Sequence, residues 1–558
     1  MRKNIFKTMV IAVGIAVSLN VNAQAPNWQW ISSGGDSNLG GTNYATACIN
    51  DGQGNTLLTG FQGQTMAIQK FDGNGNLIWT SNITQKSILN KISDIAADSD
   101  GNIYVVGNFR DTCYFGSTML VAVPGYNYIN AGFIAKLDGS GNFLWAIKGN
   151  ESSRCESITV DQNDDVLVGG YVGNNLDLQI AGLTVSKLST SKHLFVAKIN
   201  SSGTGVWGKV YQAAYTAAPS GSDCSVNDIV TDNAGNVLFA GTFNAGVSAN
   251  FGGTTVSTSG PECYVAKTNS SGDLQWVRLS TSAQSYNEAS AQGVGVDASG
   301  NVYLIGWIEE NTDFGSFTAL YSGTTGINTL VLVKYNSDGT EQWLKAFGKV
   351  ENDYATSRNI GFAATDSGDN YIAAQAGAYL SGGIDFGDGF SSSLPTNNKI
   401  VNYVVKVNNA GTTQWAKINN SNLGDEFLNM SLDASENVYV CGRWIEGSGY
   451  DLLSPPSGTS GILLAKLGNN SPSTSIIENT TYNTFSVFPN PTIAFVTLAN
   501  IPNGSAINII DITGKVVYNS VSKTENHTIN TSDFVNGVYI VQIMNKGNIA
   551  TQKLVVSK

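Results

Sequence analysis

Residues 93–149 carry the pattern that decides the fold: SDIAADSDGNIYVVGNF at Ser93–Phe109 and, after an insert, GFIAKLDGSGNFLWAIKG at Gly132–Gly149. Two tight turns, DSDGN and DGSGN, supply the Gly and Asn residues that a positive φ requires. Between them lie short runs rich in β-branched and aromatic residues, which are typical of strands: Asp94–Ala97, Ile103–Phe109, Phe133–Leu137 and Phe143–Ile147. The stretch predicts a four-stranded antiparallel sheet, which cannot bury both of its faces alone.

The same pattern recurs along the chain up to about residue 468. The turn-plus-strand element appears as GNTLLTG, GNIYVVG, DDVLVGG, GNVLFAG, GNVYLIG, DNYIAAQ and ENVYVCG, with second residues at 55, 102, 165, 236, 301, 370 and 437. A third strand ending in Lys also occurs seven times, at Lys70, Lys136, Lys198, Lys267, Lys334, Lys406 and Lys466. A strand with Trp accompanies it, at Trp30, Trp79, Trp145, Trp207, Trp276, Trp343 and Trp415. A period this regular indicates a repeat fold.

The phase of the repeats indicates how the two ends meet. The chain begins with a Trp strand, Trp28–Ser32, that has no partner before it, and the repeats end with Ile462–Leu467, which has no Trp strand after it. The first Trp strand lacks a sheet, and the last sheet lacks a Trp strand. Both are accounted for if Trp30's strand completes the last sheet, an arrangement that also removes an exposed sheet edge. The sequence therefore predicts a seven-bladed β-propeller in which the N-terminal strand closes the last blade.

The repeat pattern resembles that of a known protein family. The pattern D-x-x-G-N-x-Y-x-x-G-x-F followed by F-V/I-A-K-L-D-x-x-G-x-x-x-W resembles the bacterial seven-bladed β-propeller (SBBP) repeat family over residues 26–468. Asp98, Gly101, Asn102, Lys136 and Trp145 are among the matching positions. Two copies depart from the pattern, at Asp164-Asp165 and at Gln375. The resemblance implies architecture and secretion, but no common chemistry.

Composition disfavours several classes of binding partner and catalytic site. The 558 residues are 13% charged, contain 62 Gly and carry a net charge of −12, so duplex nucleic acid and anionic membranes are not expected partners. The two histidines, His193 and His527, are far apart, which disfavours a His-based triad or a multi-His zinc site. The chain has no G-x-S-x-G, H-E-x-x-H or phosphate-loop motif.

The N-terminus predicts export. Arg2, Lys3 and Lys7 precede an apolar run from Met9 to Leu19, which ends in Val21-Asn22-Ala23. A basic start, a short apolar run and a small-x-small site are typical of a signal peptide, here residues 1–23. The run is too short to span a bilayer, so no transmembrane segment is expected in the mature chain.

Loop lengths suggest where a ligand binds. The first–second and third–fourth turns of each repeat are uniformly tight, whereas the second–third loops and the inter-blade connections are long. The long second–third loops are Arg110–Ala131, Val172–His193, Asn244–Glu262, Ile308–Asn328 and Gly377–Val401. Because long loops on a rigid scaffold commonly bind ligands, we expect a site on that face, near the central channel.

Several residues in these loops are candidates for ligand contact. Tyrosines can stack on sugar rings: Tyr126, Tyr128, Tyr215, Tyr321 and Tyr379. The loop acids can hold a metal or act as acid and base, although solvated surface acids are the favoured interpretation: Glu309, Glu310, Asp313, Glu351, Asp353, Asp385 and Asp388. His193 is expected at the surface. The repeated Lys and Trp are expected to pack between blades, because a catalytic residue need occur only once.

The sequence also bears on calcium binding and disulfide bonds. Asp98–Asn102 resembles the start of a calcium loop, but it lacks the Glu at position twelve, and a hairpin explains every copy. No cofactor is therefore expected, with calcium kept as a minor alternative. Cys113, Cys155, Cys224 and Cys263 map to the long-loop face, so Cys113–Cys155 and Cys224–Cys263 are compatible disulfides. Cys48 and Cys441 occupy strand interiors and are expected to be buried thiols.

The C-terminal part has a different pattern. Residues 469–483 are rich in Ser, Thr and Asn and predict a linker, and residues 484–558 predict a small immunoglobulin-like sandwich. This tail resembles the type A C-terminal sorting domain of the type IX (Por) secretion system. The matching positions are Pro489, Asn490, Pro491, Gly514, Lys515, Gly537, Tyr539 and Lys553. The resemblance implies that the type IX machinery is a partner and that the product lies outside the outer membrane of a Gram-negative bacterium.

Three functions remain open. The first is a binding or adhesion module for a glycan or protein. The second is an extracellular hydrolase or lyase with its site on the long-loop face, and the third is a structural surface component. The scarcity of His and the even spread of the repeated motifs favour a role without catalysis.

Overall fold

The structure is a computed structural model of the 558-residue chain. It describes residues 25–33, 43–62, 65–86, 90–122, 130–173, 177–186, 192–215, 224–243, 247–258, 260–282, 289–321, 327–351, 360–376, 384–392, 401–419, 426–445, 460–468, 485–511, 516–545 and 548–558. These ranges contain strands and turns and no helix. The chain forms two compact units, Met1–Asn470 and Ser471–Lys558. The predicted signal peptide and the whole of the predicted linker lie outside the described residues.

The stretch at 93–149 forms a four-stranded antiparallel sheet. Its strands are β6 (Lys91–Ala97), β7 (Ile103–Phe109), β10 (Ala131–Leu137) and β11 (Phe143–Glu151), in the spatial order β6-β7-β10-β11. Lys136 pairs with Tyr104 on one side and Trp145 on the other. All four predicted strands are confirmed, because each predicted run falls inside an observed strand.

The same order recurs, and the sheets are numbered here along the chain. The first contains β2 (Tyr44–Asn50), β3 (Thr56–Gln62), β4 (Thr65–Phe71) and β5 (Leu77–Gln85), and the second is the sheet above. The third contains β12 (Ser153–Val160), β13 (Val166–Val172), β16 (His193–Ile199) and β17 (Gly205–Tyr215). The fourth contains β18 (Ser225–Thr231), β19 (Val237–Phe243), β22 (Glu262–Thr268) and β23 (Leu274–Ser282).

The later sheets follow the same rule. The fifth contains β24 (Ala289–Val296), β25 (Val302–Ile308), β28 (Ile327–Tyr335) and β29 (Glu341–Glu351). The sixth contains β30 (Gly361–Ala364), β31 (Asn370–Ala376), β34 (Val401–Val407) and β35 (Thr413–Asn419). The seventh contains β36 (Glu426–Leu432), β37 (Val438–Ile445) and β38 (Ser460–Gly468), with the N-terminal β1 (Asn27–Ser33) as its fourth strand.

The N-terminal strand has the partner that the sequence predicted for it. β1 runs antiparallel to β38, with Trp30 opposite Lys466 and Ile31 opposite Ala465. This is the same Trp–Lys pairing that the second sheet makes between Trp145 and Lys136. A strand from the start of the chain therefore completes a sheet built from its far end.

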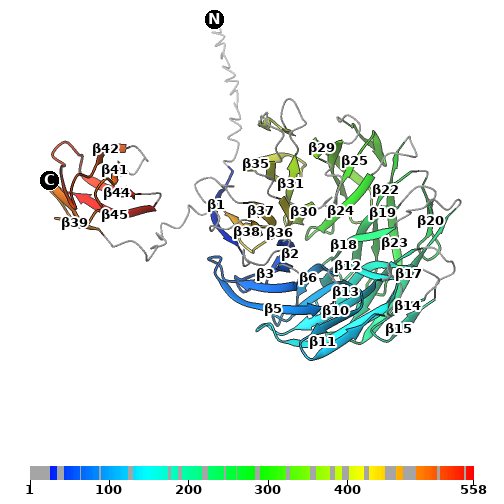
Figure 1. The fold of residues 1–558 in the computed structure, drawn as a ribbon. Helices are drawn as coiled ribbons and strands as arrows, with labels where there is room; N and C mark the ends of the chain where they lie inside the picture. Colours follow the sequence, from blue (N-terminus) through cyan, green and yellow to red (C-terminus); the bar gives the residue numbers. More distant parts are fainter. Residues whose placement is uncertain are drawn as a thin grey trace, which may run out of the picture. The chain divides into compact units, whose positions relative to one another are not determined.

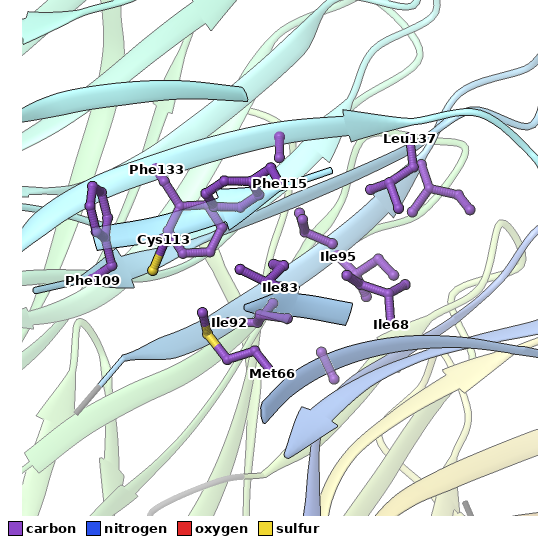
Figure 2. Packing of buried hydrophobic residues seen from close by; sticks show 14 of the residues in the cluster. Met66, Ile68, Ile83, Ile92, Ile95, Phe109, Cys113, Phe115, Phe133 and Leu137 are labelled. Carbon is purple, nitrogen blue, oxygen red and sulfur yellow. The ribbon is translucent and has the colours of Figure 1, made fainter. Parts of the chain in front are cut away.

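The sheets pack face to face through their hydrophobic sides. Their first strands lie side by side, each against the next, and β2 contacts both β6 and β36 (Figure 1). Figure 2 shows the cluster between the first and second sheets, where Met66, Ile68 and Ile83 meet Ile92 and Ile95. Because the second and third strands are buried on both faces, they read as continuous apolar runs.

The tight turns are held by a repeated set of polar contacts. In the second sheet the Asp98 carboxylate accepts hydrogen bonds from the backbone and side chain of Asn102 and from the Tyr104 hydroxyl. Lys136 lies 3.4 Å from the same carboxylate and 4.8 Å from the centre of the Tyr104 ring. Equivalent Lys–Asp pairs of 2.7–3.6 Å join Lys70 to Asp51, Lys198 to Asp161, Lys267 to Asp232 and Lys466 to Asp433.

The repeated Trp links neighbouring sheets, as predicted. The Trp79 indole N–H of the first sheet donates to the Gly139 carbonyl of the second, at 3.2 Å. Its ring covers Gly141, whose φ is 86° and whose added Cβ would lie 2.9 Å from the indole. Trp30 of the seventh sheet makes the same hydrogen bond to Gly73 of the first. Glycine is thus required at this turn both by its backbone angle and by the ring packed on it.

The long second–third inserts differ from the expectation of simple ligand loops, because each contains a β-hairpin. The hairpins are β8 (Thr112–Phe115) with β9 (Thr118–Val121), β14 (Leu178–Ile180) with β15 (Leu183–Val185), β20 (Val247–Asn250) with β21 (Thr255–Ser257), β26 (Thr312–Phe314) with β27 (Phe317–Ala319), and β32 (Ile384–Gly387) with β33 (Phe390–Ser392). Three of them, β8, β20 and β26, pair with the outer strand of the preceding sheet. They cover edges that would otherwise be unpaired.

The two disulfides that the sequence allowed are wrong. All six cysteines are buried, and none is in a disulfide bond in the structure. Cys113 packs in the cluster between the first and second sheets, whereas Cys155 packs between the second and third. Cys224 and Cys263 likewise belong to different clusters, on the two faces of the fourth sheet. A sheet separates the members of each pair.

The C-terminal unit is a small two-sheet structure with its own core. One sheet has the order β39 (Ser486–Phe488), β40 (Phe495–Ala499), β43 (Asn526–Asn530). The other has the order β42 (Val516–Val521), β41 (Ala506–Asp511), β44 (Gly537–Asn545), β45 (Asn548–Val556). Val496 and Leu498 of the first pack with Ile507, Val541 and Leu554 of the second.

Candidate functional site: the cavity between the first strands

A cavity of about 1190 Å³ lies between the first strands of the seven sheets. Its walls come from β2, β6, β12, β18, β24, β30 and β36, with Arg443 of β37 added. Every sheet contributes the same structural element, so chemical differences around the wall come only from side chains. The cavity is therefore the place where the repeat can be varied without altering the fold.

A β-bulge in the first strand projects one extra residue toward this cavity in six sheets. The bulged residues are Thr46, Ser93, Glu156, Asn227, Gln292 and Leu428, and all of them line the cavity. Each bulge follows a residue paired with a glycine of the second strand. At Gly107, for example, a Cβ would lie 2.0 Å from the Lys91 carbonyl oxygen. The last Gly of the V-V-G motif is therefore required by the bulge.

The two sheets that depart from the repeat pattern behave differently. In the third sheet, Asp164 adopts φ 59° in place of glycine, and the turn is kept by the Asp161–Asp165 hydrogen bond. Its carboxylate also accepts hydrogen bonds from the backbone and side chain of Ser99. In the sixth sheet, Gln375 replaces the glycine, and the described part of the first ladder begins later, at Gly361 opposite Ala373.

One side of the cavity carries a polar chain that crosses three sheets. The Ser157 hydroxyl lies 2.9 Å from Asp94 Oδ2 and 3.4 Å from Asp228 Oδ1. Asp94 also accepts the backbone N–H groups of Ile95 and Ile158. Asp228 accepts those of Ile229 and Val294. The two carboxyl groups thus join the second sheet to the third and the fourth to the fifth.

Burial shifts the titration of both carboxyl groups toward neutral pH. Loss of hydration raises the pKa of Asp94 to about 6, although its hydrogen bonds and Lys91 act against the shift. Loss of hydration also raises the pKa of Asp228 to about 7, and the nearby negative charge of Asp94 adds to this. Near neutral pH the chain therefore holds these two acids partly protonated.

Glu156, Asn227 and Gln292 place further polar groups on the same side. Glu156 lies 3.9 Å from Lys91 and accepts a hydrogen bond from Ser93 at 3.3 Å. Asn227 donates to the Ala291 carbonyl at 2.7 Å, and its side chain also carries an acceptor oxygen. Gln292 donates to the Ser290 hydroxyl at 2.7 Å.

The opposite side of the cavity is mixed in character. The sixth sheet contributes the apolar residues Ile360, Phe362, Ala363 and Ala364, whereas the seventh contributes Leu428 and Met430 together with the polar residues Glu426, Asn429, Ser431 and Arg443. The cavity therefore has an acidic and amide-rich arc over the second to fifth sheets and an apolar surface over the sixth. The polar residues lie near the starts of the first strands, at the end where the inter-sheet connections enter.

The tyrosines that the sequence singled out are not brought together by the described structure. Tyr126, Tyr128 and Tyr379 lie outside the described residues, as does the side chain of Tyr215, the last residue of β17. Tyr321 is half-buried beside Asn311, and it is not among the residues that line the cavity. The aromatic residues that do line it are Tyr44 and Phe362.

The candidate loop acids are dispersed. Glu309 and Glu310 are half-buried, Asp313 and Asp385 are exposed, and Asp388 forms an ion pair with Lys345 at 2.7 Å. Asp353 and the side chain of Glu351 lie outside the described residues. Within the described ranges, no group of three or more His, Cys, Asp or Glu is arranged to hold a metal ion. At the calcium-like turn, Asp98 is engaged by Asn102, Tyr104 and Lys136.

The prediction of a surface His193 is wrong. His193 is fully buried at the start of β16, opposite Val172. It faces the interior because the ladder of the third sheet already begins at this residue. Sequence inspection placed it at the end of a loop.

Sequence inspection also missed the cavity residues, although a signal was present. The position of Asp94 in the repeat is occupied by Ala47, Ser157, Asp228, Gly293 and Asn429 in other copies. A position that varies among polar and small residues inside an otherwise regular strand is unusual. Aligning the copies on their bulges, rather than on their turns, would have identified it.

The motif residues of the C-terminal unit have definite structural roles. Asn490 donates to the Lys553 carbonyl at 2.6 Å and accepts the Val555 N–H at 2.8 Å, so it joins the segment between Pro489 and Pro491 to β45. Tyr539 donates to the Val535 carbonyl and packs on Phe534. Gly514 and Lys515 lie outside the described residues, and Gly537 begins β44.

Apolar side chains are exposed on this C-terminal unit to an unusual degree. They include Phe488, Ile493, Phe495, Val516, Val521, Val535, Val538 and Ile540. Ile493 is 69% exposed and Val535 is 77% exposed, which is high for residues that ordinarily enter a core. Exposed apolar side chains suit a unit that is recognised by another protein.

Comparison with known proteins identifies this tail. Residues 486–557 match the family described as "Secretion system C-terminal sorting domain". The protein is therefore secreted or displayed at the cell surface by the type IX secretion system, as in Gram-negative bacteria of the Bacteroidetes type. No helix in the described part of the chain is long and apolar enough to cross a membrane.

Solved structures resemble the chain only distantly. A PL25 ulvan lyase bound to an oligosaccharide is 10% identical, covers 80% of this chain and 96% of its own, and has a TM-score of 0.41. A protein of unknown function from Bacteroides caccae is 11% identical over 67% of this chain and 97% of its own, with a TM-score of 0.33. The type IX surface component PorZ from Porphyromonas gingivalis is 11% identical over 95% and 100%, with a TM-score of 0.18.

These TM-scores are too low to support an argument about fold or function. Comparison with curated proteins gives no match.

Proposed function

We propose that the protein is a cell-surface seven-bladed β-propeller, residues 26–468, that binds a glycan or protein ligand without converting it. Its export depends on the signal peptide (residues 1–23) and on the sorting domain (484–558), which the linker (469–483) joins to the propeller. Support for the propeller comes from the repeated sheet order, from the pairing of β1 with β38, and from the contacts of β2 with both β6 and β36. The SBBP resemblance agrees with this arrangement.

The observation that carries the binding role is the contrast between the repeated scaffold and the varied cavity wall. Turn contacts such as Asp98–Lys136 recur from sheet to sheet. The bulged residue instead differs between sheets: in the second to fifth sheets it is Ser93, Glu156, Asn227 and Gln292. Packing alone does not require such variation. A wall that combines hydroxyl, amide and carboxylate groups with the apolar surface of the sixth sheet suits a sugar, which presents both hydroxyl groups and C–H faces.

A hydrolase or lyase is the second candidate, because the pKa values of Asp94 and Asp228 are raised to about 6 and about 7. The hydrogen bonds of these two carboxyl groups weigh against it. Both oxygens of each group already accept hydrogen bonds from backbone N–H groups or from Ser157. Groups engaged in this way hold sheets together and are poorly placed to protonate a substrate. The third candidate function, a purely structural surface component, differs from both because it requires no ligand.

The first experiment is a glycan-array screen of the purified full chain, with calcium and then with chelator. We expect saturable binding to one glycan class, with the glycan recovered unchanged by mass spectrometry. Replacing Asn227→Ala and Gln292→Ala together should weaken binding at least about tenfold. Asp100→Asn, on an exposed turn, is the control and should bind as the parent does. Conversion of the glycan would establish the enzymatic alternative, and silence across glycans and outer-surface proteins would contradict a binding role.

A further inference from the structure

Two of the six buried thiols meet at the junction between the first and last sheets. Cys48 lies in β2 of the first sheet and Cys441 in β37 of the seventh, and both are essentially inaccessible to solvent. They belong to one small hydrophobic cluster with Leu58, Phe71 and Leu464. Within this cluster the two thiol groups lie close enough to affect each other's ionisation.

The Cys48 sulfur, which belongs to the first sheet, contacts residues of the seventh sheet. Its thiol donates to the Tyr439 carbonyl at 3.7 Å, across a sequence separation of 391 residues. The Ser431 hydroxyl lies 3.9 Å from the same sulfur. Asn50, two residues further along β2, donates to Ser431 at 3.1 Å. The contact is thus part of a packed junction between the ends of the repeat.

The other four cysteines provide an internal comparison. Cys113, Cys155, Cys224 and Cys263 each belong to a different core cluster between different sheets. The Cys113 sulfur instead accepts a hydrogen bond from Asn90 at 3.2 Å. Among the six, Cys48 and Cys441 are therefore the pair whose thiols lie against each other.

The destination of the protein adds a second argument. The sorting domain sends this chain out of the cell, and thiol pairs of exported proteins encounter an oxidising environment. Two neighbouring thiols in one packed cluster are a starting geometry for a bond of about 2.05 Å.

We propose that Cys48 and Cys441 form a disulfide bond that ties the first repeated sheet to the last in the exported protein. The reaction is a thiol–disulfide exchange with a donor disulfide, either of an oxidoreductase or of a small molecule. Two S–H bonds and the donor S–S bond are exchanged for one S–S bond in this chain. The donor takes up two electrons and two protons and leaves as two thiols.

The bond forms most readily before the two sheets have docked. In the docked state, burial raises the pKa of the Cys441 thiol well above its usual value, so the reactive thiolate is scarce. A chain that meets the oxidant while its ends are still separate has both thiols exposed. Once formed, the buried bond is shielded from reductants by the same packing. The disulfide does not depend on the proposed ligand function.

The test is a thiol count on the full chain recovered from the producing bacterium. The protein is unfolded in guanidinium chloride with an alkylating reagent and no reductant, and its intact mass is measured. Four of the six cysteines should be alkylated, and proteolysis should release a peptide pair that joins Cys48 to Cys441. Six alkylated cysteines, or a linked pair involving any other cysteine, would overturn the proposal.

Stability gives a second, independent readout. Reductant added during unfolding should lower the melting temperature of the parent by about 5 °C, because the bond closes a very long loop. Cys48→Ala and Cys441→Ala should each remove this response. Cys113→Ala is the matched control and should remain as sensitive to reductant as the parent. An equal response in Cys48→Ala and in the parent would contradict the proposal.

Discussion

The tight-turn end of the sheets and the cavity end are built from the same strands, yet they use their polar residues in opposite ways. At the turns, Asp98, Tyr104 and Lys136 form a compact network whose Lys–Asp pair recurs in several other sheets. At the cavity, Ser93, Glu156 and Asn227 occupy one equivalent position with three different chemistries. Repetition marks residues that hold the fold, and variation on a fixed backbone marks residues that are free to recognise something.

The carboxyl groups at the two ends are also expected to affect folding stability in opposite ways. A turn carboxylate such as Asp98 is neutralised by a cation and by several hydrogen-bond donors, so its charge is accommodated. The cavity acids Asp94 and Asp228 lie close to each other across Ser157, and burial raises the pKa of both. Fold stability is thus expected to depend on the turn charges, and to be lowered by the cavity charges.

The largest effect is expected from breaking a turn network. Asp98→Ala should lower the free energy of unfolding by about 4 kcal/mol, because it leaves the buried Lys136 ammonium without its counter-charge. Chemical denaturation of the full chain measures this change. Asp100→Ala, an exposed residue of the same turn, is the control and should change stability by no more than about 0.5 kcal/mol. Equal effects of the two variants would show that the network does not stabilise the fold.

The cavity acids predict a pH dependence of stability. Their folded pKa values, about 6 and about 7, lie above the usual value of 3.8, so the folded chain holds protons that the unfolded chain releases. Stability is therefore fullest below about pH 4 and falls as the pH rises toward 7, and the shift of Asp94 alone corresponds to about 3 kcal/mol.

Substitution separates the contributions of the two acids. Asp228→Asn should reduce the slope, with Asp94 keeping the remainder, even if the loss of one hydrogen-bond acceptor lowers stability at every pH. Melting temperatures between pH 4 and pH 8 provide the measurement, with Asp100→Asn as a variant that keeps the full slope. An unchanged slope in Asp228→Asn would assign the dependence to other groups.

A smaller loss is expected where the Trp packs on the next sheet. Gly141→Ala should cost about 2 kcal/mol, because it combines an unfavourable positive φ with a contact 2.9 Å from the Trp79 ring. Gly52→Ala isolates the backbone contribution, since Gly52 has φ 70° and no atom within 4 Å of an added Cβ. It should cost about 1 kcal/mol. If the two losses are the same, the indole contact has no role.

The smallest effect on stability is expected at the cavity bulges. Gln292→Ala alone should change the unfolding free energy by no more than about 0.5 kcal/mol, since the side chain bonds only to the nearby Ser290. Its effect on ligand affinity should be several-fold, measured by titration with the glycan found in the array. A stability loss as large as that of Gly141→Ala would place Gln292 with the structural residues and remove the contrast between the two ends.

The sequence by itself determined the local structure of this protein, because that structure depends on neighbours in the chain. The run of strands and Asp–Gly–Asn turns predicted the sheet of residues 93–149, and the phase of the copies predicted that the strand of Trp30 completes the last sheet. The motif around Asn490 and Tyr539 predicted the sorting domain, which the family match confirms.

Tertiary structure decided what depends on residues far apart in the chain. The long inserts became hairpins on neighbouring sheets, because exposed strand edges need partners. His193 is buried, and Cys113 and Cys155 lie on opposite faces of one sheet, so neither fits its predicted role. Asp94, Ser157 and Asp228 meet across three sheets, and Cys48 meets Cys441, because packing brings equivalent positions together. Spacing along the chain carries no information about those distances.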